Sequence, residues 1–200
     1  MTNHERKAKE RKARRNLIIN GALSVFKEKG IDGATMDHIA NKAGFGTATL
    51  YYYFPRKEDV FSAIMIKGWK QLWNSCQRTI ESEHSPKEKF LNILNMIANH
   101  ILKERNLYSF LFTAPQHSIH FESEPWKEFQ GKLYKTLENL LEEGMQLGEF
   151  PKINSHLLFK AIGGSFHGIL LMGNDQSSLS RKDIESLFSR LLSTTVSPHE

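Results

Sequence analysis

The chain has 200 residues, of which 40% are hydrophobic and 24% charged, and its formal net charge is +5. This is enough apolar material for a buried core in one or two domains. No stretch approaches the roughly 18 uninterrupted apolar residues of a membrane span, and the polar N-terminus does not resemble a secretory signal. The single cysteine, Cys76, excludes an internal disulfide framework, so we expect a cytoplasmic protein without a membrane partner.

The first 30 residues predict an arm followed by a helix. Residues 1–12 are highly charged and lack apolar periodicity, which indicates a flexible arm. From there, apolar side chains recur at helical spacing, and we predict a helix from Arg14 to Lys29 that ends at Gly30.

Residues 35–57, TMDHIANKAGFGTATLYYYFPRK, predict two short helices joined by a glycine turn. Thr35 can cap the first helix, whose apolar residues recur at i, i+3, i+4 and i+7. Gly44 stands where a left-handed residue often ends a helix, and Phe45 is expected to be a buried plug between the helices. The second helix ends before Pro55. Such a unit suits insertion of its second helix into the DNA major groove, the alternative being two packed helices without a DNA role.

The charge distribution favours the DNA interpretation. Residues 1–57 hold 12 Lys and Arg against 5 Asp and Glu, whereas the rest of the chain holds 15 against 17. All the excess positive charge therefore lies beside the two short helices, as binding to phosphate requires.

The candidate DNA contacts follow from side-chain chemistry. Threonine methyl groups and alanine suit thymine methyls, and threonine hydroxyls can serve several bases. The expected base contacts are Thr47, Ala48 and Thr49, with Tyr51 between base and backbone. The expected phosphate contacts are Thr35, Tyr52 and Lys57, which would set register without reading sequence. The basic segment Arg6–Arg15 would add phosphate or minor-groove contacts.

At this point the chain resembles a known family. The segment AGFGTATLYYYFPRKEDVF at 43–61 is similar to the signature of TetR-type transcriptional regulators, and the preceding GIDGATMDHIA also matches. The resemblance is specific over about residues 14–65. It departs at Gly46, where the family often has a polar capping residue, so this position offers no side chain for a DNA contact.

The rest of the chain has helical periodicity, and because no segment alternates with period two, we expect no sheet and an all-α fold of about nine helices. The further predicted helices cover residues 57–81, 86–104, 107–113, 125–147, 154–172 and 180–195. We expect a helix-turn-helix DNA-binding domain with a basic arm, residues 1–56, followed by a helical domain for effector binding and dimerisation, residues 57–200.

The predicted body is rich in aromatic side chains. Ordinary core packing is the simplest explanation, but such residues can also line a cavity for an apolar or aromatic ligand. The resemblance favours a cavity, because bodies of this family usually hold an effector. The candidate ligand-binding residues are Trp69, Trp73, His100, Phe110 and Phe166.

Three glycines interrupt the helix predicted at 154–172. Gly163, Gly164 and Gly168 each weaken a helix by roughly 1 kcal/mol relative to alanine. Gly164 and Gly168 share a face, where another backbone could approach closely. The resemblance implies that the last two long helices form a four-helix dimer interface, and the alternative is tight packing within one subunit.

We find no motif that predicts an enzyme or a cofactor. The sequence has no glycine-rich phosphate loop and no G-x-S-x-G. His117 and His120 flank a loop and lack a carboxylate-rich partner segment, so we expect no metal site.

The sequence therefore predicts a homodimeric regulator that binds a pseudo-palindromic operator in double-stranded DNA. We expect a repressor released by a small apolar or aromatic effector. The rival hypothesis is a DNA-anchored interaction protein of the same fold that needs no small-molecule effector.

Overall fold

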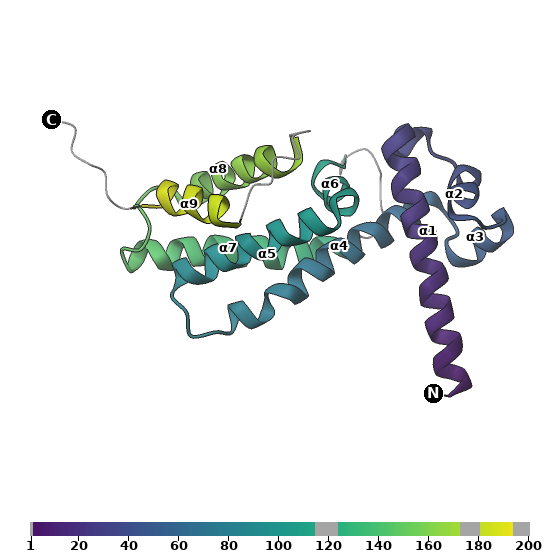
Figure 1. The fold of residues 1–200 in the computed structure, drawn as a ribbon, viewed down its shortest axis with the longest axis horizontal. Helices are drawn as coiled ribbons and strands as arrows, with labels where there is room; N and C mark the ends of the chain where they lie inside the picture. Colours follow the sequence, from purple (N-terminus) through teal and green to yellow (C-terminus); the bar gives the residue numbers. More distant parts are fainter. Residues whose placement is uncertain (1, 115–123, 173–180, 194–200) are drawn as a thin grey trace. The chain divides into compact units, whose positions relative to one another are not determined.

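The computed structural model describes residues 2–114, 124–172 and 181–193, which form helices and connecting turns without strands (Figure 1). This confirms the expected all-α fold. The helices are α1 (Asn3–Gly33), α2 (Met36–Ala43), α3 (Thr47–Tyr53), α4 (Lys57–Ile80), α5 (Pro86–Lys103), α6 (Arg105–Thr113), α7 (Trp126–Gln146), α8 (Ser155–His167), the π-helical segment η1 (Gly168–Met172) and α9 (Arg181–Leu191). Within the described ranges, no helix is long and apolar enough to cross a bilayer.

The described residues divide into two compact units. The head unit takes its residues from Met1–Gly68 and Asn106–Trp126, and the body unit from Trp69–Arg105 and Lys127–Glu200. α4 contributes residues to both units, and α6 groups with the head unit. The functional boundary expected between residues 56 and 57 remains a prediction.

The N-terminal segment is helical, so the prediction of a flexible arm is wrong. α1 begins at Asn3 behind a capping box in which Thr2 Oγ1 accepts from the Glu5 N–H and the Glu5 carboxylate accepts from the Thr2 N–H. Side chains 3–17 are all exposed, so this part of the helix has no apolar stripe to reveal it in the sequence. Caps and strong helix formers stabilise such a polar helix locally. The regular helix ends as predicted at Gly30, whose φ is 70°.

The core of the head unit depends on a close approach between α1 and α2. A Cβ on Gly21 would lie 2.9 Å from the Cα and N atoms of Ala43, so only glycine fits there without a shift. The predicted plug, Phe45, is only half-buried. Leu50 and Phe54 fill the interior instead, with exposed fractions of 0% and 1%. The expectation for Phe45 is therefore wrong, because Leu50 of α3 and Phe54 directly after α3 supply the buried side chains.

Aromatic pairs hold the body unit together. Trp69 on α4 meets Tyr134 on α7 edge-to-face, with ring centroids 5.5 Å apart. Phe90 on α5 makes a similar contact with Phe150 at 5.8 Å, beside the space left by Gly144. Such pairs contribute beyond the apolar area that they bury.

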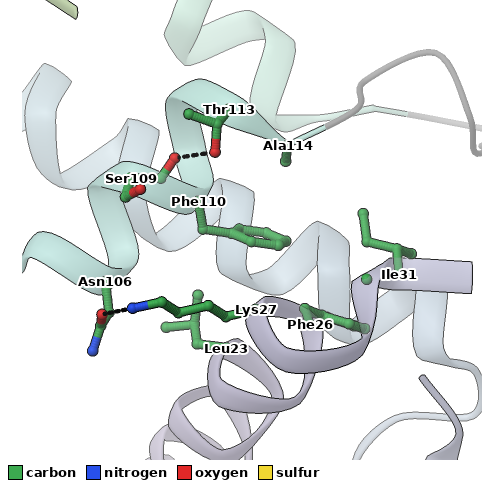
Figure 2. A pocket seen from close by; sticks show the side chains of 10 residues that line it. Leu23, Phe26, Lys27, Ile31, Asn106, Ser109, Phe110, Thr113 and Ala114 are labelled. Atoms are coloured by element: carbon green, nitrogen blue, oxygen red, sulfur yellow. Dashed lines mark hydrogen bonds between the residues drawn. The ribbon is translucent and has the colours of Figure 1, made fainter. Parts of the chain in front are cut away.

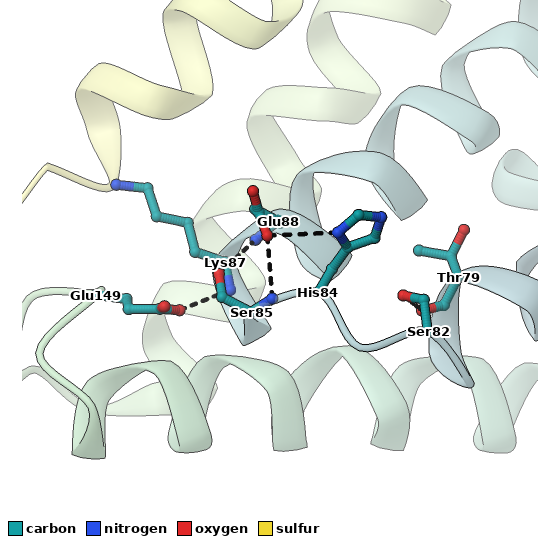
Figure 3. Close-up of polar contacts among 7 residues, drawn as sticks. All are labelled: Thr79, Ser82, His84, Ser85, Lys87, Glu88 and Glu149. Atoms are coloured by element: carbon teal, nitrogen blue, oxygen red, sulfur yellow. Dashed lines mark hydrogen bonds and ion pairs between the residues drawn. The ribbon is translucent and has the colours of Figure 1, made fainter.

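The start of α5 is held by hydrogen bonds from two parts of the chain (Figure 3). Ser85 Oγ accepts from the Glu88 N–H at 3.3 Å, and the Glu88 carboxylate accepts from the Ser85 N–H at 3.1 Å. Glu149, which follows α7, accepts from the Lys87 N–H at 2.9 Å. These bonds satisfy N–H groups that have no partner within the helix, and they tie α5 to the end of α7.

Candidate nucleic-acid interface

The predicted helix-turn-helix is present as α2, a turn and α3. Thr35 has extended backbone angles and caps α2, since its Oγ1 accepts from the His38 N–H at 3.2 Å. Gly44 is left-handed, with φ 74° and ψ 30°, and ends the helix by donating to the carbonyls of Ala40 and Asn41. Both local predictions, the threonine cap and the glycine stop, are confirmed.

α3 exposes one face and buries the other. Ala48 is exposed, Tyr51 and Tyr52 are 51% and 71% exposed, and Leu50 is fully buried. Both tyrosines expected to contact DNA, Tyr51 and Tyr52, therefore face outward. The outward face therefore offers a methyl group and two phenol hydroxyls, which suit contact with base edges and phosphates.

The two threonines at the start of α3 are half-buried, and one is tied to α2. The Thr47 hydroxyl donates to Asp37 Oδ1 at 2.8 Å, which joins the first turn of α3 to the first turn of α2. No motif in the sequence identifies Asp37 as a partner of the recognition helix. Because its proton is engaged, the Thr47 hydroxyl can accept a hydrogen bond from a base without breaking this contact.

The helical N-terminus places basic side chains beside α3. Lys7, Arg11 and Arg14 recur at i, i+4 and i+7 on α1, and together with one acidic residue, Glu10, and with Tyr52 and Tyr53 they surround a shallow hollow. The helix thus converts a basic segment into a basic face next to the exposed tyrosines. Such a face can neutralise DNA phosphates.

Arg15 has a structural contact in the head unit. Its guanidinium carbon lies 4.4 Å from the centroid of the Phe54 ring, in cation–π geometry. Burial lowers the pKa of Arg15, and the charge of nearby Arg11 lowers it further. Arginine remains charged at neutral pH, so the contact is that of a cation with an aromatic ring.

The side chain of Lys57, a predicted phosphate contact, points toward backbone carbonyl groups. Its ammonium donates to three carbonyl oxygens, which belong to Ile31 (3.0 Å), Asp32 (3.2 Å) and Ala34 (3.2 Å). An ammonium has three N–H donors, and these three acceptors use all of them. No sequence pattern predicts this contact, because Lys57 lies 23 to 26 residues from the carbonyl groups that it binds.

The structure does not gather all five candidate ligand-binding residues in one unit. Trp69 and Phe166 are buried in the body unit, and Trp73 and His100 are half-buried there. Burial lowers the pKa of His100, although Glu104 partly offsets this.

Phe110 belongs to the head unit. Its ring stacks on Phe26 of α1 at 5.7 Å and meets Phe61 of α4 edge-to-face at 5.5 Å. Phe110 lines a hollow of about 270 Å³ between α1 and α6. Lys27, which lines the same hollow (Figure 2), donates to Asn106 Oδ1 at 3.3 Å. Phe110 thus joins three helices of the head unit, and its role toward an effector stays a prediction.

The glycines of α8 and η1 face open space. A Cβ on Gly164 or Gly168 would meet no atom of the described chain within 4 Å. The alternative of tight packing within one subunit is therefore wrong for the described residues. Leu157, on the same helix, is 64% exposed. Leu187 and Leu191 of α9 are also exposed, at 40% and 52%.

The candidate metal ligands His117 and His120 lie outside the described residues. In the rest of the chain that the structure covers, no group of three or more His, Cys, Asp or Glu residues could hold a metal ion. Cys76 is buried, and burial raises the pKa of its thiol to about 11. A thiol with this pKa is protonated and unreactive at neutral pH.

Comparisons with known proteins agree with this geometry. The family model described as "Bacterial regulatory proteins, tetR family" matches residues 18–64. The "Fatty acid metabolism regulator protein" of Bacillus subtilis (strain 168) is 25% identical over 145 residues, which cover 72% of this chain and 74% of the relative. The HTH-type transcriptional regulator TtgW of Pseudomonas putida, described as uncharacterized, is 31% identical over 96 residues, covering 41% and 72%.

Among solved structures, FadR from Bacillus subtilis in complex with stearoyl-CoA has a TM-score of 0.72 and 23% identity, covering 90% of this chain and 98% of that one. PfmR from Thermus thermophilus has a TM-score of 0.73 and 18% identity, covering 87% and 95%. These neighbours have the same fold, with the helix-turn-helix at the N-terminus. The chain is a DNA-binding transcriptional regulator, and it belongs to the tetR family of bacterial regulatory proteins.

Proposed function

We propose that this regulator is a homodimeric repressor that leaves its operator when a small apolar effector occupies the body unit. The observation that supports DNA recognition best is the exposed face of α3, with Ala48, Tyr51 and Tyr52, beside the basic face of α1. We place this activity in the cytoplasm, and it needs no enzymatic step and no cofactor.

The contacts with DNA divide by chemistry. Thr47, Ala48 and Thr49 would meet base edges, and Tyr51 would bridge base and backbone. Phosphates would be held by Tyr52 and by the N-terminus of α2 at Thr35. Lys7, Arg11 and Arg14 would add charge contacts that do not depend on sequence.

Dimerisation would use the exposed faces of α8 and α9. The two helices pack on each other through Phe166 and Phe188, whose ring centroids are 5.8 Å apart. Gly164 and Gly168 leave room for a second backbone, and Leu157 on α8 and Leu187 and Leu191 on α9 are exposed. A two-fold dimer would present two α3 helices to half-sites about 34–36 Å apart, which predicts a pseudo-palindromic operator.

The effector would be an apolar molecule, and a long-chain acyl group is the first candidate. The Bacillus subtilis relative is named as a regulator of fatty acid metabolism, and the FadR structure is a complex with stearoyl-CoA. The aromatic body of this chain, with Trp69, Tyr134 and Phe159 in successive edge contacts, suits an apolar guest. Only a ligand that binds the DNA-competent and released states differently can act as an inducer.

One observation supports the interaction-protein alternative. Leu147 and Ile153, between α7 and α8, are 67% and 50% exposed and could contact another protein. That alternative predicts DNA binding that no small molecule changes.

The experiment begins with selection of duplexes from a random-sequence library by the wild-type protein. Thr49→Ala should relax preference at particular base pairs, by about 1–3 kcal/mol at most. Lys7→Ala should instead weaken binding to all duplexes about equally. If Thr49→Ala and Lys7→Ala give the same uniform loss, α3 does not read bases and the proposed recognition is wrong.

A further inference from the structure

The hollow between α1 and α6 is amphipathic. Its apolar wall includes Phe26 and Phe110, whose rings stack with centroids 5.7 Å apart, and Ile31. Lys27 and Asn106 add polar groups, and in Figure 2 these two side chains lie at one end of the lining residues and Ile31 at the other. The hollow therefore offers a ligand an apolar surface with a cation at one end.

The hollow has space for a small ligand. Its volume of about 270 Å³ is close to the lower end of the range for small-molecule sites, which is about 300–1,000 Å³. Gly30 also lines it, and a Cβ there would meet no atom of the described chain within 4 Å. Every lining residue belongs to the head unit, so the hollow is separate from the body unit, where we place the effector.

Lys27 carries a charge that no acidic side chain of the described residues neutralises through an ion pair. Its ammonium donates to Asn106 Oδ1 at 3.3 Å, which is a neutral acceptor. The adjacent acid, Glu28, pairs with Lys42 instead, at 2.9 Å. Since an ammonium has three N–H donors, Lys27 can donate two more hydrogen bonds, and a carboxylate is the acceptor that matches its charge.

We propose that this hollow is a binding site for an aromatic monocarboxylate. The ligand ring would pack against the half-buried ring of Phe110, in the offset or edge-to-face geometry that aromatic pairs prefer. The carboxylate would accept hydrogen bonds from the Lys27 ammonium and from the amide N–H of Asn106. This site is a second small-molecule input, and its assignment does not depend on DNA binding or on an effector in the body unit.

The first test titrates the wild-type protein with 2-naphthoate and follows methyl signals by NMR. Leu23 and Ile31 line the hollow, and Leu133 and Leu140 report on the body unit. At an ordinary ligand efficiency, a molecule of this size has a Kd of about 1 mM. We expect the Leu23 and Ile31 signals to shift saturably with about this Kd. Shifts confined to Leu133 and Leu140, or no saturation at about ten times this Kd, would overturn the proposal.

Two matched ligands separate the contributions of charge and ring in the wild-type protein. The neutral 2-naphthamide should bind at least about threefold more weakly at low salt, because an exposed ion pair contributes little by itself and the charged hydrogen bond adds to it. Decahydro-2-naphthoate keeps the charge but has no aromatic ring, and it should bind about 2- to 10-fold more weakly. Equal affinity for 2-naphthoate and 2-naphthamide would contradict the role of Lys27, and equal affinity for the saturated acid would contradict that of Phe110.

The second test compares Lys27→Met with Lys29→Met, each of which removes one exposed charge from the same helix. Lys29 does not line the hollow, so we expect only Lys27→Met to weaken 2-naphthoate, again by at least about threefold. An unchanged Kd for Lys27→Met would overturn the proposal. An equal loss in both variants would indicate general attraction to a basic surface and would overturn it as well.

The third test fills the hollow with Ser109→Phe, because Ser109 is half-buried and lines it. Circular dichroism checks the fold, and the variant should lose the saturable shifts of Leu23 and Ile31. A folded Ser109→Phe protein that binds 2-naphthoate with the wild-type Kd would place the ligand elsewhere and contradict the assignment. If Ser109→Phe does not fold, the matched ligands and the lysine variants decide the matter.

Discussion

Replacing Gly164 with leucine should separate the dimer and leave each subunit folded. A Cβ at this position meets no atom of the described chain within 4 Å, so the new side chain has space within the subunit. Removing a glycine from a helix also stabilises that helix by roughly 1 kcal/mol. We therefore expect the subunit of Gly164→Leu to be at least as stable as the wild type.

In the dimer, the same leucine would enter an interface that we expect to be close-packed. Overpacking costs about 1–3 kcal/mol per site, and a two-fold axis places two such sites in the interface. The sum of about 2–6 kcal/mol would raise the dimer Kd by about 30-fold to 10⁴-fold.

Sedimentation velocity over a range of protein concentrations measures this Kd, and circular dichroism reports whether the subunit is folded. Gly131→Leu on α7 is the control, because Gly131 is also exposed and a Cβ there also meets nothing within 4 Å. A folded Gly164→Leu protein with the dimer Kd of the wild type would refute the assignment of this helix face.

Two further substitutions test the interior of the protein. Gly21→Ala should lower the unfolding temperature of the head unit, because the new methyl group would clash with Ala43. Such overpacking costs about 1–3 kcal/mol, which outweighs the roughly 1 kcal/mol gained in helix propensity. Unchanged thermal unfolding would contradict the close approach of α1 and α2. Burial lowers the pKa of His100 in the folded protein, so on acidification the unfolded chain binds the proton first. The contribution of His100 to stability is therefore present above about pH 6.5, and it is lost as the pH falls toward the pKa of His100 in the folded state. His100→Gln should therefore flatten the decline of unfolding free energy below about pH 6.5 in denaturant titrations, and an unchanged decline would show that other groups cause it.

The parts of the site that the sequence predicts are those set by local chemistry. The cap at Thr35 and the end of α2 at Gly44 are predictable because the hydrogen bonds that form them span only three or four residues. The alternation of buried Leu50 with exposed Tyr51 and Tyr52 likewise follows from helical periodicity. Such features need no knowledge of the rest of the fold.

Contacts between distant segments escaped prediction. The three carbonyls that bind Lys57 take their positions only when α1, residues 31–34 and α4 are folded together. The hydrogen bond from Thr47 to Asp37 likewise requires that α2 and α3 pack against each other. Residue type alone places Phe110 with Trp69, whereas in the structure Phe110 packs against helices of the head unit. Apolar periodicity does not predict the polar start of α1, because a helix whose side chains are all exposed has no apolar stripe in its sequence.

The most direct test of the central claim is thermodynamic linkage between operator and effector. The selected duplex is titrated with protein in the absence and presence of saturating stearoyl-CoA, and stearoyl-CoA is titrated with and without the duplex by tryptophan fluorescence. A ligand-responsive repressor predicts a 5- to 150-fold weaker affinity for the duplex, a coupling of about 1–3 kcal/mol, and the same factor in both titrations. If stearoyl-CoA and a panel of other apolar and aromatic metabolites all bind with equal affinity with and without the duplex, or fail to bind, the account is contradicted and the DNA-anchored interaction protein takes its place.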